Sequence, residues 1–410
     1  MDRELVPAAE AAEMLGVKRQ TLYAYVSRGL LASHHQQGTR GSLFDPAELD
    51  GLLQQGRGKG ESPRPDVVIE SGLTRIDDDG HFYRGRAAID LAATASFESV
   101  SEFLWHGGQV DAGSDLAPVS WNFDVDVELI DKVADLLGPR AAPLDWVRVL
   151  LPLLAAADPM RADIRPAAVE SLGRQLLPLL FVAASVGAQS SNLTRSSPET
   201  ARAASVALGA VGGDSRNERE VRIVNQVLVL MADHELAAST AAVRLAASFG
   251  ADPYASLQAG YAVIGGAMHG AASTAVERFI ADVVEAGEPA IVVGERLRAG
   301  EHIPGLGHSV YPGVDPRFTA LFEFTRQSYP TSSAVQAGGA IIGFTRERGL
   351  PEPNVDFAIA VLAHASGWNE GAGEVLFALA RSAGWIGHAI EEYTQRSNIR
   401  LRAVYTGPRL

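Results

Sequence analysis

From Tyr83 to its C-terminus the chain carries almost no β-strand signal, and its alanine- and leucine-rich segments have helical spacing. The segment 374–393 is the strongest case, because Leu379 and Ile386 lie on one apolar stripe while Trp385 lies on the opposite face. A helix that is apolar nearly all round belongs in the interior of a protein. With 410 residues, enough for two or three domains, the sequence predicts an all-α main body in which this helix is buried.

The first 55 residues are organised differently. A short helix ending near Leu15, a turn at Gly16 and a second helix at 18–26 resemble the helix-turn-helix of MerR-like and excisionase-like domains, in which a small wing follows. Residues 1–60 hold seven basic and seven acidic side chains, so a helical interaction module that touches no DNA is the alternative. The basic side chains cluster on the second helix and the wing. The predicted DNA contacts are Lys18, Arg19, Gln20, Thr21, Arg28 and Arg40.

Residues 56–66 have the composition of a linker. Beyond them, the segments 67–70 and 74–76 near the turn-forming run 77–80 predict a small β-hairpin.

The composition excludes several kinds of site. The net charge of −14 argues against non-specific nucleic-acid binding by the whole chain. The absence of cysteine excludes disulfides, thiolate metal sites and a cysteine nucleophile, and the ten histidines show no metal-ligand spacing. The N-terminus lacks a signal-peptide pattern, and the apolar stretch 176–188 is too short to span a bilayer, so we expect a cytoplasmic protein.

Three short segments, 265–270, 305–311 and 354–357, place one proton-transferring side chain each among glycines or apolar residues. These side chains are His269, His308 and Asp356. Each has a structural alternative. Asp356, for example, follows the candidate N-cap Asn354, where a helix N-terminus lowers the pKa of a carboxyl while apolar neighbours raise it. The sequence leaves the direction of that shift open.

The order of these segments, together with several others, resembles the citrate synthase family. The other matching segments are 83–85, 97–100, 233–240, 315–317, 380–385 and 405–407, whereas 110–180 matches poorly. The resemblance implies condensation of acetyl-CoA with oxaloacetate, followed by hydrolysis of citryl-CoA to citrate and CoA. In this scheme Asp356 is the base, His269 hydrogen-bonds the thioester oxygen, and His308 donates to the keto oxygen. No permanently bound cofactor is implied, and acetyl-CoA is a co-substrate.

Arginines supply a separate argument. Arg381 lies on the helix predicted to be buried, and a buried guanidinium needs an anion. Arginine suits carboxylates, and oxaloacetate has two of them. Arg381 and Arg317 are therefore the predicted carboxylate ligands, with His234 as a further contact. The alternative for Arg381 is an ion pair with Glu374 or Glu392.

The resemblance also implies residues for CoA and for a second subunit. Leu306, Gly307 and Val310 are the CoA candidates, although Leu306 and Pro312 depart from the family pattern. Arg400, or else Arg402, is placed where family members present an arginine to the partner's active site, so a homodimer with shared sites is expected. Leu401 replaces the usual proline there.

The implied fold is a nearly all-helical body with a larger and a smaller domain. Its predicted boundaries are a helix-turn-helix domain at 1–55, a linker at 56–66, a large domain at 67–269 and 361–410, and a small domain at 270–360. Two rival functions remain: a 2-methylcitrate synthase that uses propionyl-CoA, and a DNA-binding regulator that uses the body as a metabolite sensor.

Overall fold

The computed structural model divides into two compact units, Met1–Ile69 and Glu70–Leu410. The residues it describes are 6–15, 22, 31, 42–46, 48–49, 69–77, 80–106, 116–123, 127–138, 140–188, 202–266, 269–270, 272–311, 313–401, 405 and 407.

The N-terminal unit has a small core of its own. Strand β1 (Val6–Pro7) pairs antiparallel with β2 (Leu43–Phe44), and helix α1 (Ala8–Met14) lies where the sequence predicts the first helix. The buried apolar side chains that pack together in this core are Ala11, Ala12, Leu22, Leu31, Phe44 and Leu49. Apart from Leu22, which is helical, the second helix lies outside the described residues, as do the linker and all six predicted DNA contacts.

A three-stranded antiparallel sheet opens the C-terminal unit. Its strands are β3 (Thr74–Asp77), β4 (Gly80–Tyr83) and β5 (Arg86–Ala87), in the order β3-β4-β5. The predicted hairpin around 77–80 is present, with 74–77 paired to the strand that follows the turn. Of the predicted segment 67–70, residues 69 and 70 lie outside the strands, and residues 67 and 68 lie outside the described residues. In β4 the buried residues His81 and Tyr83 alternate with half-buried ones, as expected for a strand with one face toward the interior.

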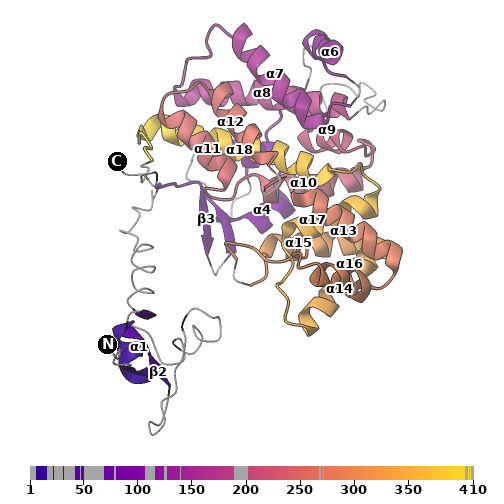
Figure 1. The fold of residues 1–410 in the computed structure, drawn as a ribbon. Coiled ribbons are helices and arrows are strands. Elements are labelled where there is room, and N and C mark those ends of the chain that lie inside the picture. The colour runs from indigo at the N-terminus through magenta and orange to yellow at the C-terminus, as the bar shows by residue number, and fades with distance from the viewer. Residues whose placement is uncertain are drawn as a thin grey trace. The chain divides into compact units, whose positions relative to one another are not determined.

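The rest of this unit is helical, as predicted (Figure 1). Several helices begin at a proline, which has no N–H to leave unpaired in the first turn. The helices are α4 (Ala88–Thr94), α5 (Phe97–His106), α6 (Val127–Leu136), α7 (Pro143–Ala157), α8 (Pro166–Gly187), α9 (Ala203–Ala210), α10 (Glu218–Met231), α11 (Ala238–Ser248), α12 (Pro253–Ile264), α13 (Ala272–Ala286), α14 (Pro289–Arg298), α15 (Pro316–Ser328), α16 (Ser333–Glu347), α17 (Val355–Ser366) and α18 (Ala372–Gln395).

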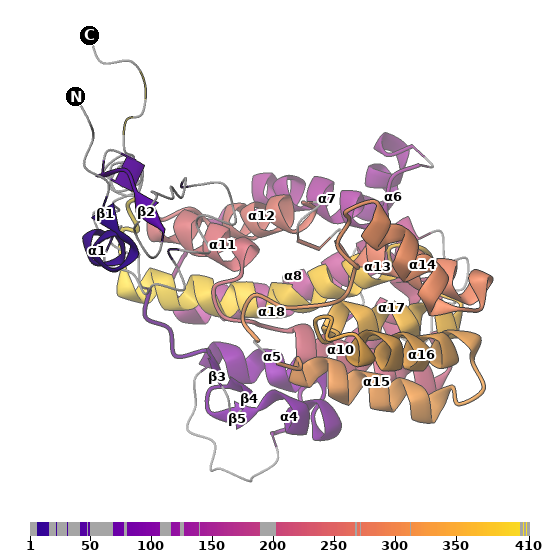
Figure 2. The same cartoon turned by 60° about the horizontal axis from the view of Figure 1, so that its bottom comes forward.

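Helix α18 is the central element of the unit. It is buried along most of its length and packs against helices from every part of the unit, including α8, α10, α11 and α12. Figure 2 shows it running through the body, with α13 to α17 gathered at one end. Gly384 permits the closest approach, because a Cβ there would lie 2.5 Å from the Ala232 carbonyl oxygen at the end of α10. The division into domains at 269/270 and 360/361 remains a prediction.

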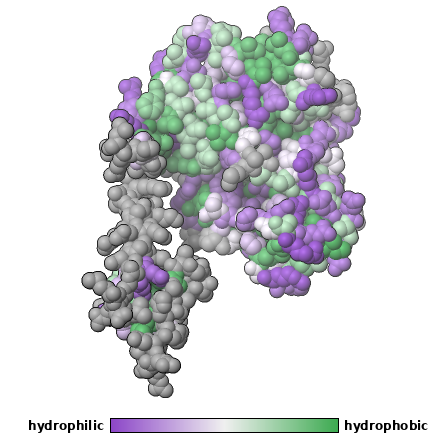
Figure 3. All heavy atoms as spheres, viewed as in Figure 1, coloured by the Kyte–Doolittle hydropathy of each residue, from purple (hydrophilic) through white to green (hydrophobic). Residues whose placement is uncertain are grey.

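Some apolar surface is exposed. Figure 3 shows apolar side chains gathered over the part of the body that carries α7, α11 and α12, and the exposed ones there include Leu153, Leu245 and Phe249. By length and composition alone, α8 is the one helix of the described residues that could cross a membrane. Of its apolar window, 56% is buried inside the unit, as in a core helix.

Candidate active site

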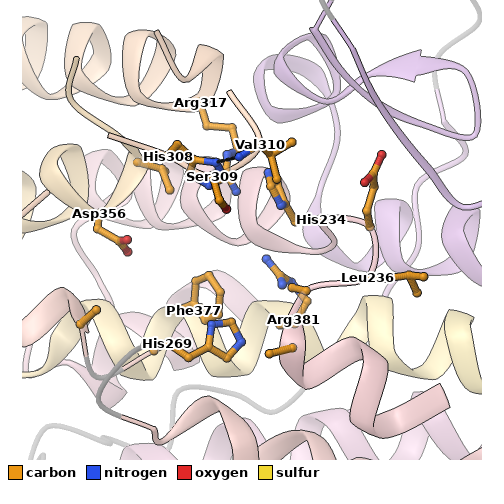
Figure 4. Close-up of a pocket in the computed structure, with 16 residues that line it drawn as sticks. His234, Leu236, His269, His308, Ser309, Val310, Arg317, Asp356, Phe377 and Arg381 are labelled. Carbon is orange, nitrogen blue, oxygen red and sulfur yellow. Dashed lines mark hydrogen bonds between the residues drawn. The ribbon is translucent and has the colours of Figure 1, made fainter. Parts of the chain in front are cut away.

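A cavity of about 480 Å³ brings the predicted catalytic segments together. Figure 4 shows His308 and Arg317 on one wall, His269 and Phe377 on the opposite wall, and Asp356 and His234 at its two sides. Arg381 projects into it from α18. Of the predicted catalytic and substrate-binding residues, only Arg400 does not line this cavity.

Asn354 joins the loop that carries His308 to the helix that carries Asp356. As the N-cap of α17, its side-chain oxygen accepts a hydrogen bond from the Phe357 N–H at 3.3 Å. Its side-chain amide donates to the Gly307 carbonyl at 2.9 Å. Two catalytic candidates that are far apart in sequence are therefore held at a fixed separation.

The structure resolves the direction of the Asp356 shift. Burial raises the pKa of Asp356 to about 6, and the positive charges of Arg317 and Arg381 only partly offset it. Loss of hydration in the cavity therefore outweighs the attraction of the two guanidinium groups. A carboxylate in this state is a stronger base than an ordinary aspartate and still ionises near neutral pH.

Asp315 organises the wall opposite His269. Its carboxylate accepts hydrogen bonds from Arg317 Nε at 3.0 Å and Nη2 at 2.9 Å, and from the Val355 N–H at 3.0 Å. It thus connects the first turn of α15 to the first turn of α17. Asp315 lies within one of the motifs that the sequence analysis identifies. Its contact with Val355 joins distant parts of the chain and has no signal in the sequence.

His269 lies between α12 and α13 in a tight turn. Gly270 is required there, since a Cβ would lie 2.5 Å from the Ile264 carbonyl oxygen. His269 Nε2 is 2.8 Å from Ser239 Oγ, and its ring meets Phe377 edge-on. Burial, assisted by the charge of Arg381, lowers the pKa of His269 to about 4, so the ring is neutral at pH 7. Sequence reasoning missed Ser239, whose only signal is its place five residues after His234.

His308 has a defined tautomer. Its Nδ1 accepts hydrogen bonds from the backbone N–H groups of Val310 at 3.0 Å and Tyr311 at 3.4 Å. Burial and Arg317 lower the pKa of His308, so the neutral ring carries its proton on Nε2. That nitrogen lies 3.4 Å from Arg317 Nη2. Two donors that face each other in this way call for an acceptor oxygen from a ligand.

His234 completes this group of rings. Its Nε2 is 3.0 Å from the Tyr311 hydroxyl. Tyr311 is a second residue of the site that the sequence analysis did not assign to it. Burial and the charge of Arg317 lower the pKa of His234 well below its usual value.

The structure distinguishes the two readings of Arg381. Its Nε donates to the Met231 carbonyl at 3.0 Å, and Nη1 has no hydrogen-bond partner within the described part of the chain. The predicted alternatives pair elsewhere: Glu392 with Arg244 at 3.0 Å, and Glu374 with Arg148 at 4.0 Å. Arg381 is thus a buried guanidinium that faces the cavity without a carboxylate partner among these residues.

The CoA candidates are only partly in the cavity. Val310 lines it, but Leu306 pairs with Pro353 in a β-bridge, and the Gly307 N–H donates to the Glu352 carbonyl at 2.7 Å. Arg400 is exposed and lies after the end of α18, and Arg402 is outside the described residues.

Comparison with known proteins agrees with this geometry. Residues 64–402 match the family model "Citrate synthase, C-terminal domain", and residues 8–57 match "Helix-turn-helix domain". A citrate synthase of Haloferax volcanii is 31% identical over 83% of this chain and 94% of its own length. A 2-methylcitrate synthase of Corynebacterium glutamicum is 26% identical over 79% of this chain and 88% of its own.

Solved structures show the same fold. The citrate synthase of Thermotoga maritima superposes with a TM-score of 0.69 at 22% identity, covering 85% of this chain and 96% of that one. The Thermoplasma acidophilum enzyme, solved with carboxymethyl coenzyme A and oxaloacetate, gives 0.68 at 23% identity, over 84% and 95%. The chain therefore belongs to the citrate synthase family of transferases and carries a helix-turn-helix domain at its N-terminus.

Proposed function

We propose that the protein condenses acetyl-CoA with oxaloacetate and hydrolyses the resulting citryl-CoA, releasing citrate and CoA. The observation that supports this best is the excess of hydrogen-bond donors in the cavity. His308 Nε2, Arg317 Nη2 and Arg381 Nη1 face a space that contains one carboxylate with a raised pKa, and Nη1 has no hydrogen-bond partner among the described residues. A small dicarboxylate supplies acceptor oxygens to such a group of donors.

Each group has a defined task in this reaction. Asp356 removes a proton from the methyl carbon of acetyl-CoA, and the thioester oxygen becomes an enolate oxygen. With the Ser239 hydroxyl donating to Nε2, the neutral His269 carries its proton on Nδ1 and can donate it to that oxygen. The enolate carbon attacks the keto carbon of oxaloacetate, while His308 Nε2–H donates to the keto oxygen. Arg317, Arg381 and His234 hold the carboxylates. No resident cofactor is needed.

The pH dependence of the reaction follows from Asp356. Its pKa is raised to about 6, and the base acts only when ionised, so activity is lost as the pH falls through 6. We expect kcat/KM for acetyl-CoA to fall about tenfold per pH unit below about pH 6 and to be level between about pH 7 and 8. His269, with a pKa lowered to about 4, does not titrate in this range. Initial rates from about pH 5 to pH 8 measure the profile, and a level profile down to pH 5 would contradict the assignment.

The acyl group is the least constrained part of the proposal. Relatives include both citrate synthases and 2-methylcitrate synthases. One methylene changes discrimination by only about 1–3 kcal/mol, so both thioesters can be substrates. Parallel kcat/KM measurements with acetyl-CoA and propionyl-CoA decide the matter, and a strong preference for propionyl-CoA would reject citrate synthesis in favour of 2-methylcitrate synthesis.

We further propose a homodimer in which Arg400 serves the partner's site. Arg400 is exposed and absent from the cavity of its own chain, and the exposed apolar Leu153, Leu245 and Phe249 suit a subunit interface. If sites are shared, mixing inactive Arg400→Ala and Asp356→Asn chains restores activity, because a mixed dimer contains one intact site. A mixture that stays inactive although the subunits exchange would reject this role.

The helix-turn-helix match favours a second activity, DNA binding by residues 1–55. In this proposal Lys18, Arg19, Gln20, Thr21, Arg28 and Arg40 contact DNA, and the synthase body reports the metabolite level. A gel-shift titration with the gene's own upstream DNA tests it at low salt, with a Lys18→Ala/Arg19→Ala variant as control. Equal retardation by both proteins, or none, would leave assembly or another protein contact as the role of the domain.

For the reaction as proposed, we place the protein in the cytoplasm, where it would serve the tricarboxylic acid cycle.

A further inference from the structure

His81 lies on β4 beside the active site, and its surroundings are unusual for a structural residue. Its side chain is 3% exposed, and neither ring nitrogen has a hydrogen-bond partner among the residues that the structure describes. A neutral imidazole carries one donor and one acceptor, and leaving both unpaired in the interior costs free energy. An apolar ring would fill the same space without this penalty. The polarity of His81 therefore needs a functional explanation.

The neighbouring ring of His234 offers this functional explanation. The two rings meet edge to face, with centroids 5.4 Å apart and an interplanar angle of 68°. His81 also meets the ring of Tyr83 edge to face at 4.8 Å, and the Tyr83 hydroxyl donates to the Val229 carbonyl at 2.9 Å. His81 thus packs against a hydrogen-bonded tyrosine and against the ring of a proposed substrate ligand.

The sheet and the His234 segment are also connected on either side of these rings. The Thr74 hydroxyl donates to the Asp233 carboxylate, and the Ile76 N–H donates to Glu235 Oε1 at 3.2 Å. Since residues on both sides of His234 are bonded to β3, the distance between His81 and His234 is well defined.

The electrostatics suit a hydrogen bond from a neutral ring. Burial, with the charge of Arg317, lowers the pKa of His81 to about 3, and Asp233 and Asp315 oppose this shift only in part. His81 therefore adds no third positive charge beside Arg317 and Arg381 at any physiological pH. It offers a donor or an acceptor without changing the net charge that an anionic substrate meets.

Without ligand, His234 Nε2 is bonded to Tyr311. To donate a hydrogen bond to a substrate carboxylate, His234 must present a protonated nitrogen, and its second nitrogen then needs a partner of its own. A centroid separation of 5.4 Å is short enough for one nitrogen of each imidazole to reach hydrogen-bond distance when the rings are suitably oriented. We propose that His81 is a positioning residue that hydrogen-bonds His234 in the oxaloacetate-bound site and fixes which nitrogen of His234 carries the proton. This inference rests on the proposed function, in which His234 contacts oxaloacetate.

The test is His81→Phe, which keeps a ring and removes both nitrogens. We expect KM for oxaloacetate to rise about tenfold, kcat to stay within about threefold, and the thermal midpoint without ligand to stay the same or rise. His81→Gln, which restores a donor and an acceptor, recovers part of the affinity. Phe82→Leu is the matched control on the same strand, because the Phe82 ring packs against Arg75 instead, and it leaves KM unchanged.

A second readout separates positioning from packing. In ¹⁵N spectra of histidine-labelled protein, oxaloacetate should shift the His234 tautomer in the wild type and not in His81→Phe. A wild-type KM in His81→Phe, or an unaltered tautomer response, would overturn the inference. So would a lowered thermal midpoint accompanied by equal losses in every kinetic constant. A wild-type chain that neither binds nor turns over oxaloacetate would instead overturn the proposed function. Because the wild type and His81→Phe are measured together, failure of the His81 inference is distinguished from failure of the proposed function.

Discussion

Replacing Asp356 by asparagine is expected to lower kcat about a thousandfold, within the range that a positioned general base contributes. Asparagine has nearly the same volume, and among the described residues the Asp356 carboxylate makes no hydrogen bond that the change would break. Asn354 continues to cap α17. The thermal midpoint should therefore hold or rise, because a desolvated carboxylate is replaced by a neutral amide.

The kinetic pattern identifies the role. Since Asp356 acts on the methyl carbon of acetyl-CoA, KM for oxaloacetate should stay within about threefold of the wild type. Steady-state rates with both substrates varied provide these constants. A kcat within tenfold of the wild type, in a protein of unchanged stability, would remove Asp356 from the role of base.

Replacing Arg381 by leucine is expected to raise KM for oxaloacetate about a hundredfold, a loss of about 2.7 kcal/mol of binding. The guanidinium is buried, which lowers its pKa to about 10, so it is still charged at pH 7. In the described part of the chain its Nη1 has no partner, and its Nε donates to the Met231 carbonyl. Removing a buried charge that lacks a carboxylate partner should not lower the thermal midpoint of the ligand-free protein.

Arg244 provides the matched control, since its guanidinium is equally buried but is paired with carboxylates. It contacts Glu391 and, at 3.0 Å, Glu392. Arg244→Leu leaves these carboxylates without their cation, so we expect it to lower the free energy of unfolding by about 3–5 kcal/mol. Thermal unfolding with and without oxaloacetate compares the two variants. If Arg381→Leu destabilised the protein like Arg244→Leu and kept a normal KM, Arg381 would be a structural residue.

Local sequence patterns were enough to predict the all-α body and the burial of the helix at 374–393. In α18 both faces are buried, including Leu379 and Ile386 on the apolar stripe and Trp385 on the opposite face. A helix that is apolar all round is stable only in the interior of a protein. The motif resemblance likewise brought His234, His269, His308 and Asp356 to one cavity. Their roles stay predictions until the variants are measured.

The features of the site that could not be predicted from the sequence depend on long-range contacts. The pKa of Asp356 is set by a cavity assembled from several helices, so the competition between burial and the helix N-terminus has no local answer. The bonds of Asp315 to Val355 and of Ser239 to His269 join separate segments. The turn residues at 77–80 mark a hairpin, and the structure adds that the strand paired with 74–77 is the one that follows the turn.

The most direct test of the proposed reaction is the release of CoA thiol from acetyl-CoA, measured with and without oxaloacetate. We predict release that requires oxaloacetate, yields one citrate per thiol, and nearly disappears in Asp356→Asn. Release that is equally fast without oxaloacetate, or no release from either acetyl-CoA or propionyl-CoA in the folded protein, would contradict the proposed condensation.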